Sequence, residues 1–317
     1  MSNIARSGRA FSALPGAAEG DGVRFWRLRF FVAVLRARPS FAVGYAIVTT
    51  VVVIALLAPW LVPYGPMNAD PSMYLLPPGG SHILGTDGTG MDIFSRVLFA
   101  PRVDLAIAVV GTFLSATIGG AVGAVVGYYE GQHTWRRALS TFVMRSADVL
   151  QAFPVFVFAI ALVAVFGQSV KSIILAIAFV NTPIYLRLMR IQVLSISRLR
   201  YVEAAYVAGA SDVAILWRHV IPNAIAPLVA QLSVNIGWAV LLTAGLSFVG
   251  AGVVAPTPEW GSMIAMGFQN VVTGQWWPSV FPGIALCITV FGFALVGASV
   301  EVLADPAQRR VLSGSLS

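Results

Sequence analysis

Residues 103–128 read VDLAIAVVGTFLSATIGGAVGAVVGY, an apolar stretch whose only charged residue is Asp104. The hydrocarbon core of a bilayer requires about 20 mainly apolar residues per helix, and backbone groups within it must be paired internally. The stretch therefore predicts a membrane-spanning helix. Small residues recur in it at intervals of four, a spacing that lets a second helix approach closely, and this predicts tight packing, within this chain in preference to a second one. The small residues are Gly111, Ser115, Gly119, Gly123 and Gly127.

The whole chain shares this apolar character. Hydrophobic residues make up 58% of the 317 residues and charged residues 10%, with a mean hydropathy of +0.83. Soluble domains carry about 25% charged residues, so an ordinary soluble or disordered protein is excluded. We expect an all-α polytopic membrane protein with six transmembrane helices, near residues 41–62, 103–128, 141–166, 172–194, 225–250 and 279–303.

Positive charge is distributed unevenly between the connections. Of 20 Lys and Arg residues, 17 lie in the two termini and in the second-to-third and fourth-to-fifth connections, leaving only Arg96, Arg102 and Lys171 elsewhere. Lys and Arg concentrate on the cytoplasmic side of membrane proteins, so both termini are predicted to be cytoplasmic. The net charge of +7 and the pI of about 10.1 then reflect membrane topology and not nucleic-acid binding.

The N-terminal region has a basic and aromatic character of its own. Residues 24–38 read RFWRLRFFVAVLRAR, a pattern typical of a helix that lies in the membrane interface with its arginines at anionic headgroups. A plain basic flank that sets topology is the alternative. The predicted organisation is a cytoplasmic N-terminus with this helix over 1–40, a six-span domain over 41–303 and a cytoplasmic tail over 304–317.

Several catalytic chemistries are excluded by missing residues. Lys171, the only lysine, follows Val170, so the phosphate-binding loop G-x-x-x-x-G-K-[ST] is impossible. The three histidines are far apart, G-x-S-x-G and H-E-x-x-H do not occur, and the single Cys287 excludes a cysteine-based metal cluster. We expect no catalytic residues, no metal site and no cofactor bound by this chain.

The connection between the fourth and fifth predicted spans, within residues 195–224, contains RLRYVEAAYVAGASDVAILWRHVIPNA. Residues 201–208 predict a short helix that Gly209 ends, because glycine accepts the left-handed turn after a helix. Ser211 is suited to cap the next helix, and Asp212 to its positive end, while Pro222 and Asn223 mark re-entry into the membrane. The pattern predicts a rigid helix–Gly–helix knob suited to docking on a soluble partner, with a passive interfacial loop as the alternative.

This connection resembles the EAA signature of the integral-membrane permease subunits of ATP-binding-cassette (ABC) importers. The resemblance implies the type I ABC importer permease fold and a coupling role for the knob. Glu203 would make a polar contact or cap a helix, with a solvated surface charge as the alternative. Ala204 and Ala205 would allow close approach, and Gly209 would set the angle. The residues implied in ATPase coupling are Glu203, Ala204, Ala205, Gly209, His219, Pro222 and Asn223.

Two further stretches resemble the C-type permease of dipeptide, oligopeptide and nickel importers. They are HILGTDGTGMDIFSRVLFAPRVDL from His82 and LSFVGAGVVAPTPEWGSM ending at Met263. Residues 82–102 and 256–261 of these stretches are predicted outside the cell, and we expect them to form part of a gate or of the landing surface for a binding protein. Alternatively, Arg96 and Arg102 pair with Asp92 and Asp104 and tie the loop down. The implied contact residues are His82, Asp87, Asp92, Arg96, Arg102 and Trp260.

The chain departs from the family pattern at a few positions. Met91 replaces an arginine, and Pro101 and Asp104 replace a small residue and a serine. Near the end of the sixth span, members often carry Asn, Asp, Arg and Asp at the positions of Ala294, Ala298, Glu301 and Val302. These departures do not affect the prediction of the membrane fold. They affect the assignment of the chain to a particular substrate class within the family.

Polar residues in the fifth predicted span are separated by multiples of four and so share one helix face. They are Gln231, Asn235, Thr243 and Ser247. Polar groups in membrane helices face the bundle interior or a water-filled path. These residues have two alternative roles: they line a translocation path, or they form hydrogen bonds with neighbouring helices.

The resemblance implies a permease subunit of an ATP-driven peptide importer, with nickel or another small solute as the alternative cargo. Expected partners are a second, B-type permease, two nucleotide-binding ATPases that carry ATP and Mg, an external substrate-binding protein and the lipid bilayer of a bacterial or archaeal inner membrane. A stand-alone secondary transporter would need ion-coupling charges at mid-membrane, and the sequence places Asp148 at a span entrance, three residues from Arg145.

Overall fold

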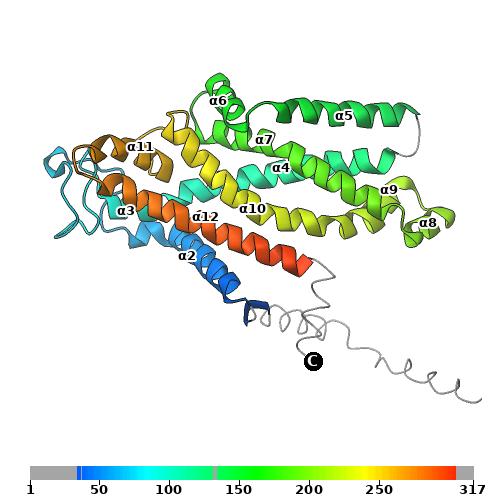
Figure 1. Cartoon of the computed structure of the whole chain (residues 1–317), viewed down its shortest axis with the longest axis horizontal. Coiled ribbons are helices and arrows are strands. Elements are labelled where there is room, and N and C mark those ends of the chain that lie inside the picture. The colour runs from blue at the N-terminus through cyan, green and yellow to red at the C-terminus, as the bar shows by residue number, and fades with distance from the viewer. Residues whose placement is uncertain (1–33, 37, 131–133, 305–317) are drawn as a thin grey trace, which may run out of the picture.

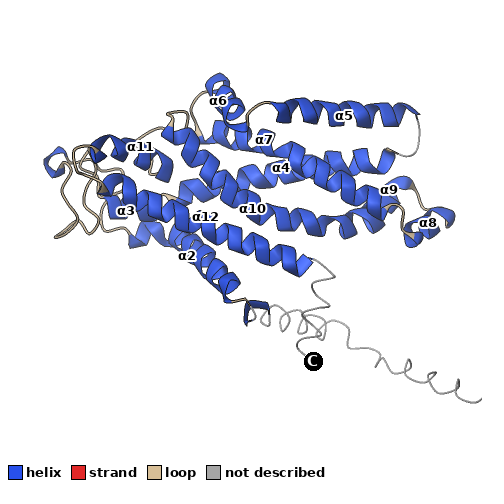
Figure 2. Ribbon diagram, in the orientation of Figure 1, coloured by secondary structure: helices blue, strands red, loops and turns tan. Residues whose placement is uncertain are grey.

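The structure of the chain is a computed structural model that describes residues 34–36, 38–130 and 134–304. Its regular elements over these residues are helices, as Figure 2 shows. Five helices are long and apolar enough to cross a membrane, and one bent pair is a sixth candidate. This confirms the predicted all-α polytopic fold. The predicted interfacial helix over 24–38 and the tail over 304–317 lie almost wholly outside the described residues.

The five continuous spans run roughly along one direction through the molecule (Figure 1). The ends of these helices lie within four residues of the predicted ends, because the length of each apolar stretch determines where its helix begins and ends. Pro39 and Pro101 stand in the first turns of α2 and α4, where a missing backbone N–H costs no helical hydrogen bond. The helices are α2 (Pro39–Leu61), α4 (Pro101–Tyr129), α7 (Val170–Ile196), α10 (Ile221–Phe248) and α12 (Trp277–Ala304).

The third predicted span is not one helix. It consists of α5 (Thr134–Ala152) and α6 (Val155–Phe166), which meet at an angle of 94° at Phe153 and Pro154. Proline removes a backbone donor and disfavours helical geometry in the residue before it, and Pro154 has an extended ψ of 120°. The prediction of a continuous helix over 141–166 was therefore wrong at this point.

Helix α4 packs most extensively against α7. Gly119 and Gly123 of α4 face the backbone of α7: an added Cβ at Gly119 would lie 2.4 Å from the Thr182 carbonyl oxygen, and one at Gly123 would lie 2.4 Å from that of Leu186. Hence larger residues are excluded from this contact. The small-residue spacing seen in the sequence is confirmed as an intrachain packing surface.

Shorter elements gather at the two ends of the bundle (Figure 1). At one end, called the loop end, residues 62–92 with the turn η1 (Pro71–Met73) cover α3 (Ile93–Phe99) and α11 (Trp260–Val271). At the other, called the knob end, α8 (Arg200–Val207) and α9 (Asp212–Ile215) project between α7 and α10. The knob is defined as residues 200–215.

Candidate functional site

The knob is built as its sequence predicts. Helix α8 ends before Gly209, which has φ +82° with open space around it. The Ser211 hydroxyl then accepts a hydrogen bond from the Ala214 backbone N–H at 3.4 Å and begins α9. Val202 and Ile215 are buried in one cluster with residues of α4, α7 and α10. The knob is therefore fixed to the spans through its apolar side.

The opposite side of the knob is exposed and partly apolar. Glu203 and Ala204 are exposed, while Ala205 is half-buried. Around them Tyr206 is 67% and Val207 81% exposed, and Trp217 just beyond α9 is 65% exposed. Exposed apolar side chains that gather in one region are typical of interaction sites, so the exposed residues of the knob are suited to docking.

The start of the fifth span agrees with the prediction, since α10 begins at Ile221, directly before Pro222 and Asn223. Pro222 and Asn223 do not interrupt the chain, because the π-helical turn η2 (Leu216–Val220) joins α9 to α10 without a loop. Pro222 falls in the first turn of α10, where proline is tolerated. Asn223 donates a hydrogen bond through Nδ2 to the His219 carbonyl oxygen at 2.7 Å. His219 and Asn223 thus stabilise this junction.

Two ion pairs join helices near the knob end, and the sequence analysis missed both. Arg190 of α7 makes a bidentate pair with Glu130 at the end of α4, at 2.7 and 2.6 Å. Arg187 pairs with Asp148 of α5 at 2.6 Å. Paired planar groups of this kind fix orientation as well as distance. Their separations of 60 and 39 residues along the chain explain why local patterns gave no signal.

The polar residues of α10 are engaged within the chain. Gln231 donates to the Asn235 side-chain oxygen at 2.9 Å, and the Thr243 hydroxyl donates to the Ala239 carbonyl oxygen at 2.9 Å. The Ser247 hydroxyl accepts from the Val253 backbone N–H at 3.2 Å. Asn235, Thr243 and Ser247 are buried, while Gln231 is half-buried. In this conformation these hydrogen bonds lie within α10 and between α10 and the segment that follows it.

At the loop end, Arg96 lies at the centre of a buried cluster and is fully inaccessible. Its guanidinium donates to the carbonyl oxygens of Pro66 at 2.9 Å and Pro256 at 3.1 Å, and its Nε lies 3.6 Å from Asp87. The alternative considered above, in which Arg96 pairs with Asp92 or Asp104, was wrong about the partners. Arg96 instead joins three segments distant in sequence, which is a tie-down role with different partners.

The neighbouring candidates also have local partners. Asp92 caps α3 by accepting from the Ser95 backbone N–H at 2.7 Å, and it lies 2.9 Å from His82 Nδ1. The Arg102 guanidinium lies 5.2 Å from the centre of the Phe99 ring and does not make the alternative pairing with Asp92 or Asp104. Arg102 is nevertheless exposed, so it remains accessible to a partner.

Trp260 is buried, with 2% of its surface exposed. Its indole Nε1 donates to the Val97 carbonyl oxygen, and its backbone N–H donates to an Asp104 carboxylate oxygen, both at 3.2 Å. The buried Glu259 caps α11 by accepting from the backbone N–H groups of Gly261 and Ser262. Glu259 was missed, although an acidic residue directly before a helix is a recognised N-terminal signal. Arg96 and Trp260 thus offer no surface to a partner in this conformation.

Comparison with known proteins decides the family. Residues 119–311 match the family described as binding-protein-dependent transport system inner membrane component. The chain belongs to this family. Residues 24–78 of the permease match the N-terminal transmembrane domain of oligopeptide transport permease C, which confirms that the chain resembles a C-type permease.

Relatives match the permease over most of its length. The probable D,D-dipeptide transport system permease protein of Escherichia coli (strain K12) is 36% identical over 87% of the permease and 90% of its own chain. The dipeptide transport system permease protein of Alkalihalophilus pseudofirmus is 34% identical, over 83% and 84%. A glutathione transport system permease protein of Escherichia coli O6:K15:H31 is 37% identical, over 94% and 95%.

The fold also matches a solved transporter. An inward-facing structure of the MetNI methionine ABC transporter superposes with a TM-score of 0.54 at 18% identity, covering 66% of the permease and 96% of that chain. The permease is accordingly a multi-pass inner-membrane transport subunit and not an enzyme. In its described residues no group of three or more His, Cys, Asp and Glu side chains could hold a metal ion.

Proposed function

We propose that the permease is one of two membrane subunits of a peptide importer powered by ATP hydrolysis on partner subunits. The observation that carries the proposal is the knob, which has one side buried among the spans and the other side exposed and partly apolar. The relatives are named as permeases for dipeptides and glutathione. These names support a peptide cargo and do not favour nickel.

Coupling would run through the knob to the spans. An ATPase that docks on Glu203, Ala204 and the exposed aromatic and aliphatic residues would push or pull a body that is continuous with α10 through η2. His219, Pro222 and Asn223 lie in that junction, so they would transmit the movement and not contact the ATPase. ATP would then bias a two-state membrane element by binding one state better than the other. ATP and Mg would be held by the two partner ATPases.

The loop end would face the outside of the cell and receive a substrate-binding protein. The buried Arg96 and Trp260 support a role in shaping this end, because they tie α3, residues 62–92 and the segment before α11 together. Exposed groups such as Arg102 would make direct contacts. His82, Asp87 and Asp92 would hold the loop in the form that the binding protein recognises.

The translocation path would form between this permease and a second, B-type permease. The polar residues of α10 would supply hydrogen-bonding groups to such a path, and the half-buried Gln231 supports this role. The charge distribution supports cytoplasmic termini and a cytoplasmic knob.

Purification and reconstitution test the proposal. The permease should co-purify with a second permease and with an ATPase. In proteoliposomes, the assembled complex should import dipeptides only when the binding protein and ATP are both present. Transport by the permease alone, driven by an ion gradient, would contradict it.

A further inference from the structure

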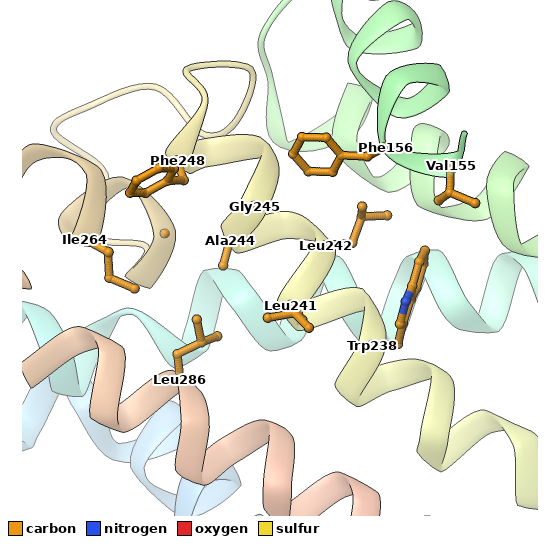
Figure 3. Close-up of a pocket in the computed structure, with 11 residues that line it drawn as sticks. Val155, Phe156, Trp238, Leu241, Leu242, Ala244, Gly245, Phe248, Ile264 and Leu286 are labelled. Carbon is orange, nitrogen blue, oxygen red and sulfur yellow. The ribbon is translucent and has the colours of Figure 1, made fainter. Parts of the chain in front are cut away.

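Two cavities lie on either side of Trp238, in the wall of the bundle where the third span bends. The first, here called the apolar cavity, has a volume of about 480 Å³ between α6, α10, α11 and α12. Figure 3 shows Val155 and Phe156 of α6 facing Trp238 and Leu241 of α10 across it. The second, here called the amide cavity, measures about 220 Å³ and shares Val155 and Trp238 with the first. The two cavities are therefore neighbours with a common wall.

Asn181 of α7 lines the amide cavity and is unusual. Its side chain is fully buried, and among the described residues neither its amide nitrogen nor its amide oxygen has a hydrogen-bond partner. A buried polar group is normally paired, and leaving one unpaired is unfavourable. A carboxamide with a free donor and a free acceptor at the edge of a cavity is suited to a ligand that offers both groups.

Further polar groups lie beyond the amide cavity along α7 and α10. One helical turn from Asn181 toward the knob end, the Tyr185 hydroxyl lies near the Asn235 amide of α10. Neither Tyr185 Oη nor Asn235 Nδ2 has a hydrogen-bond partner among the described residues, and Gln231 bonds to Asn235 one turn farther along. Because α7 and α10 run in opposite directions, these groups lead from the amide cavity toward the knob end.

The lining of the cavities limits what could bind. The residues around both cavities carry no charged side chain, and the polar side chains are Gln151, Asn181 and the Trp238 indole. Charged ligand groups would lose their hydration without compensation. A peptide unit, in contrast, presents one N–H donor and one C=O acceptor, the complement of a free carboxamide.

We propose that the two cavities form one subsite of the solute path, in which Asn181 hydrogen-bonds a peptide unit of the cargo and the apolar cavity receives an apolar side chain of the same molecule. The proposal rests on the proposed peptide function and extends it, because it assigns the permease a part in selecting the cargo. The bend at Pro154 would contribute to this subsite, because it positions Val155 in the wall that both cavities share.

Import of a peptide mixture provides the test. Assembled complexes in proteoliposomes receive binding protein, ATP and an equimolar mixture of Gly-Xaa dipeptides, and the imported peptides are counted by mass spectrometry. Asn181→Leu should lower import of every transported dipeptide about tenfold or more, because it removes the donor and acceptor together. ATP hydrolysis without binding protein and the yield of assembled complex should stay unchanged. Wild-type levels of import by this variant would overturn the subsite.

The apolar cavity has its own variant. Leu241→Trp fills it, and should lower import of Gly-Leu and Gly-Phe several-fold more than import of Gly-Gly. An equal effect on all three dipeptides would indicate a packing defect and would overturn the side-chain assignment. If the wild-type complex imports no dipeptide, the proposed function itself is wrong. If the wild-type complex imports dipeptides and Asn181→Leu imports them equally well, only the subsite is wrong.

Cysteine accessibility decides the matter if Asn181→Leu fails to assemble. In a Cys287→Ser background, Asn181→Cys should react with a small neutral thiol reagent in at least one nucleotide state, and transported dipeptides should slow the reaction. Ala178→Cys, buried on the same helix and lining neither cavity, should stay unreactive. Cys at 181 that never reacts, or that reacts at a rate unaffected by peptide, would overturn the subsite. If the cysteine at position 181 reacts in the isolated permease but not in the complex, the cavity is part of the interface with the second permease. This result would also overturn the subsite.

Discussion

Single glycines determine how closely α4 and α7 approach each other. At Gly119 an added Cβ would collide with backbone, 2.4 Å from the Thr182 carbonyl oxygen, and backbone in a packed helix pair has little freedom to move. The adjacent Gly120 meets only the end of the Leu228 side chain at 3.1 Å, and a side-chain end can rotate away. Adjacent glycines of one helix therefore differ sharply in what they exclude.

This difference predicts opposite outcomes for two matched substitutions. Gly119→Ala should destabilise the permease by about 1–3 kcal/mol, the range found for overpacked sites. Gly120→Ala should have little effect, since alanine also favours helix over glycine. Thermal unfolding of both variants in detergent measures the difference. Equal unfolding temperatures for the two would contradict the packing argument.

Trp260 separates a structural role from a contact role. Because it is 2% exposed and its indole bonds to Val97, Trp260→Ala should leave a cavity and cost about 3–5 kcal/mol, as is typical for buried aromatic residues. Trp260→Phe keeps most of the packing and loses one hydrogen bond, so we expect it to cost about 0.5–1.5 kcal/mol. Thermal unfolding and binding-protein stimulation of ATP hydrolysis are measured together. Full stability of Trp260→Ala with lost stimulation would favour a direct contact.

At the scale of an element, the knob depends on one backbone conformation. Gly209 has φ +82° and no atom within 4 Å of an added Cβ, so the obstacle to substitution is conformational and not steric. Left-handed backbone costs L-residues about 1–2 kcal/mol, less for Asn and more for β-branched residues. The angle between α8 and α9 is thus encoded at this position.

Gly209→Val should therefore uncouple transport, whereas Gly209→Asn should retain most coupling. Insertion should be normal in both, because the site lies outside the spans. The measurement is ATP hydrolysis by the reconstituted complex with binding protein and peptide, for which we expect a loss of about tenfold in the valine variant. Unchanged hydrolysis would disprove the coupling assignment of the knob.

The elements differ in how well the sequence predicts them. The five continuous spans and the knob follow from apolar length, Gly209 and Ser211, all of which are local signals. Pro154 is visible in the sequence as well, but a proline in a span predicts a kink, and a 94° bend depends on how α6 packs against α7 and α10. The position of Pro222 at the start of α10 was predicted, but the π-helical turn η2 before it was not, because no residue type signals such a turn.

The burial of residues at the loop end could not be predicted from local sequence patterns. Charge counting placed Arg96 on a membrane face without indicating that it is enclosed. Its partners Pro66 and Pro256 lie 30 and 160 residues away, so the contact exists only once α3, α11 and residues 62–92 have assembled. The orphaned Asn181 was invisible for the same reason, because whether a buried amide is paired depends on three neighbouring helices.

For the whole molecule, function requires the knob and the loop end to lie on opposite sides of the membrane. The structure separates them along the bundle (Figure 1), and the charge distribution predicts a cytoplasmic knob. Each end offers a well-exposed position for labelling: Val207 of the knob is 81% exposed and Val272 after α11 is 90% exposed. These positions report on the two faces without disturbing packing.

Orientation is then tested by single cysteines in a Cys287→Ser background. Val272→Cys should react with a membrane-impermeant maleimide added to intact cells, because the loop end is expected outside. Val207→Cys should react only after the membrane is permeabilised. Wild-type protein with Cys287 alone serves as the control for labelling of the native thiol. The reverse pattern would place the knob outside the cell, where no ATP-driven partner could dock on it, and would overturn the coupling, gate and path assignments together, since each assumes a cytoplasmic knob.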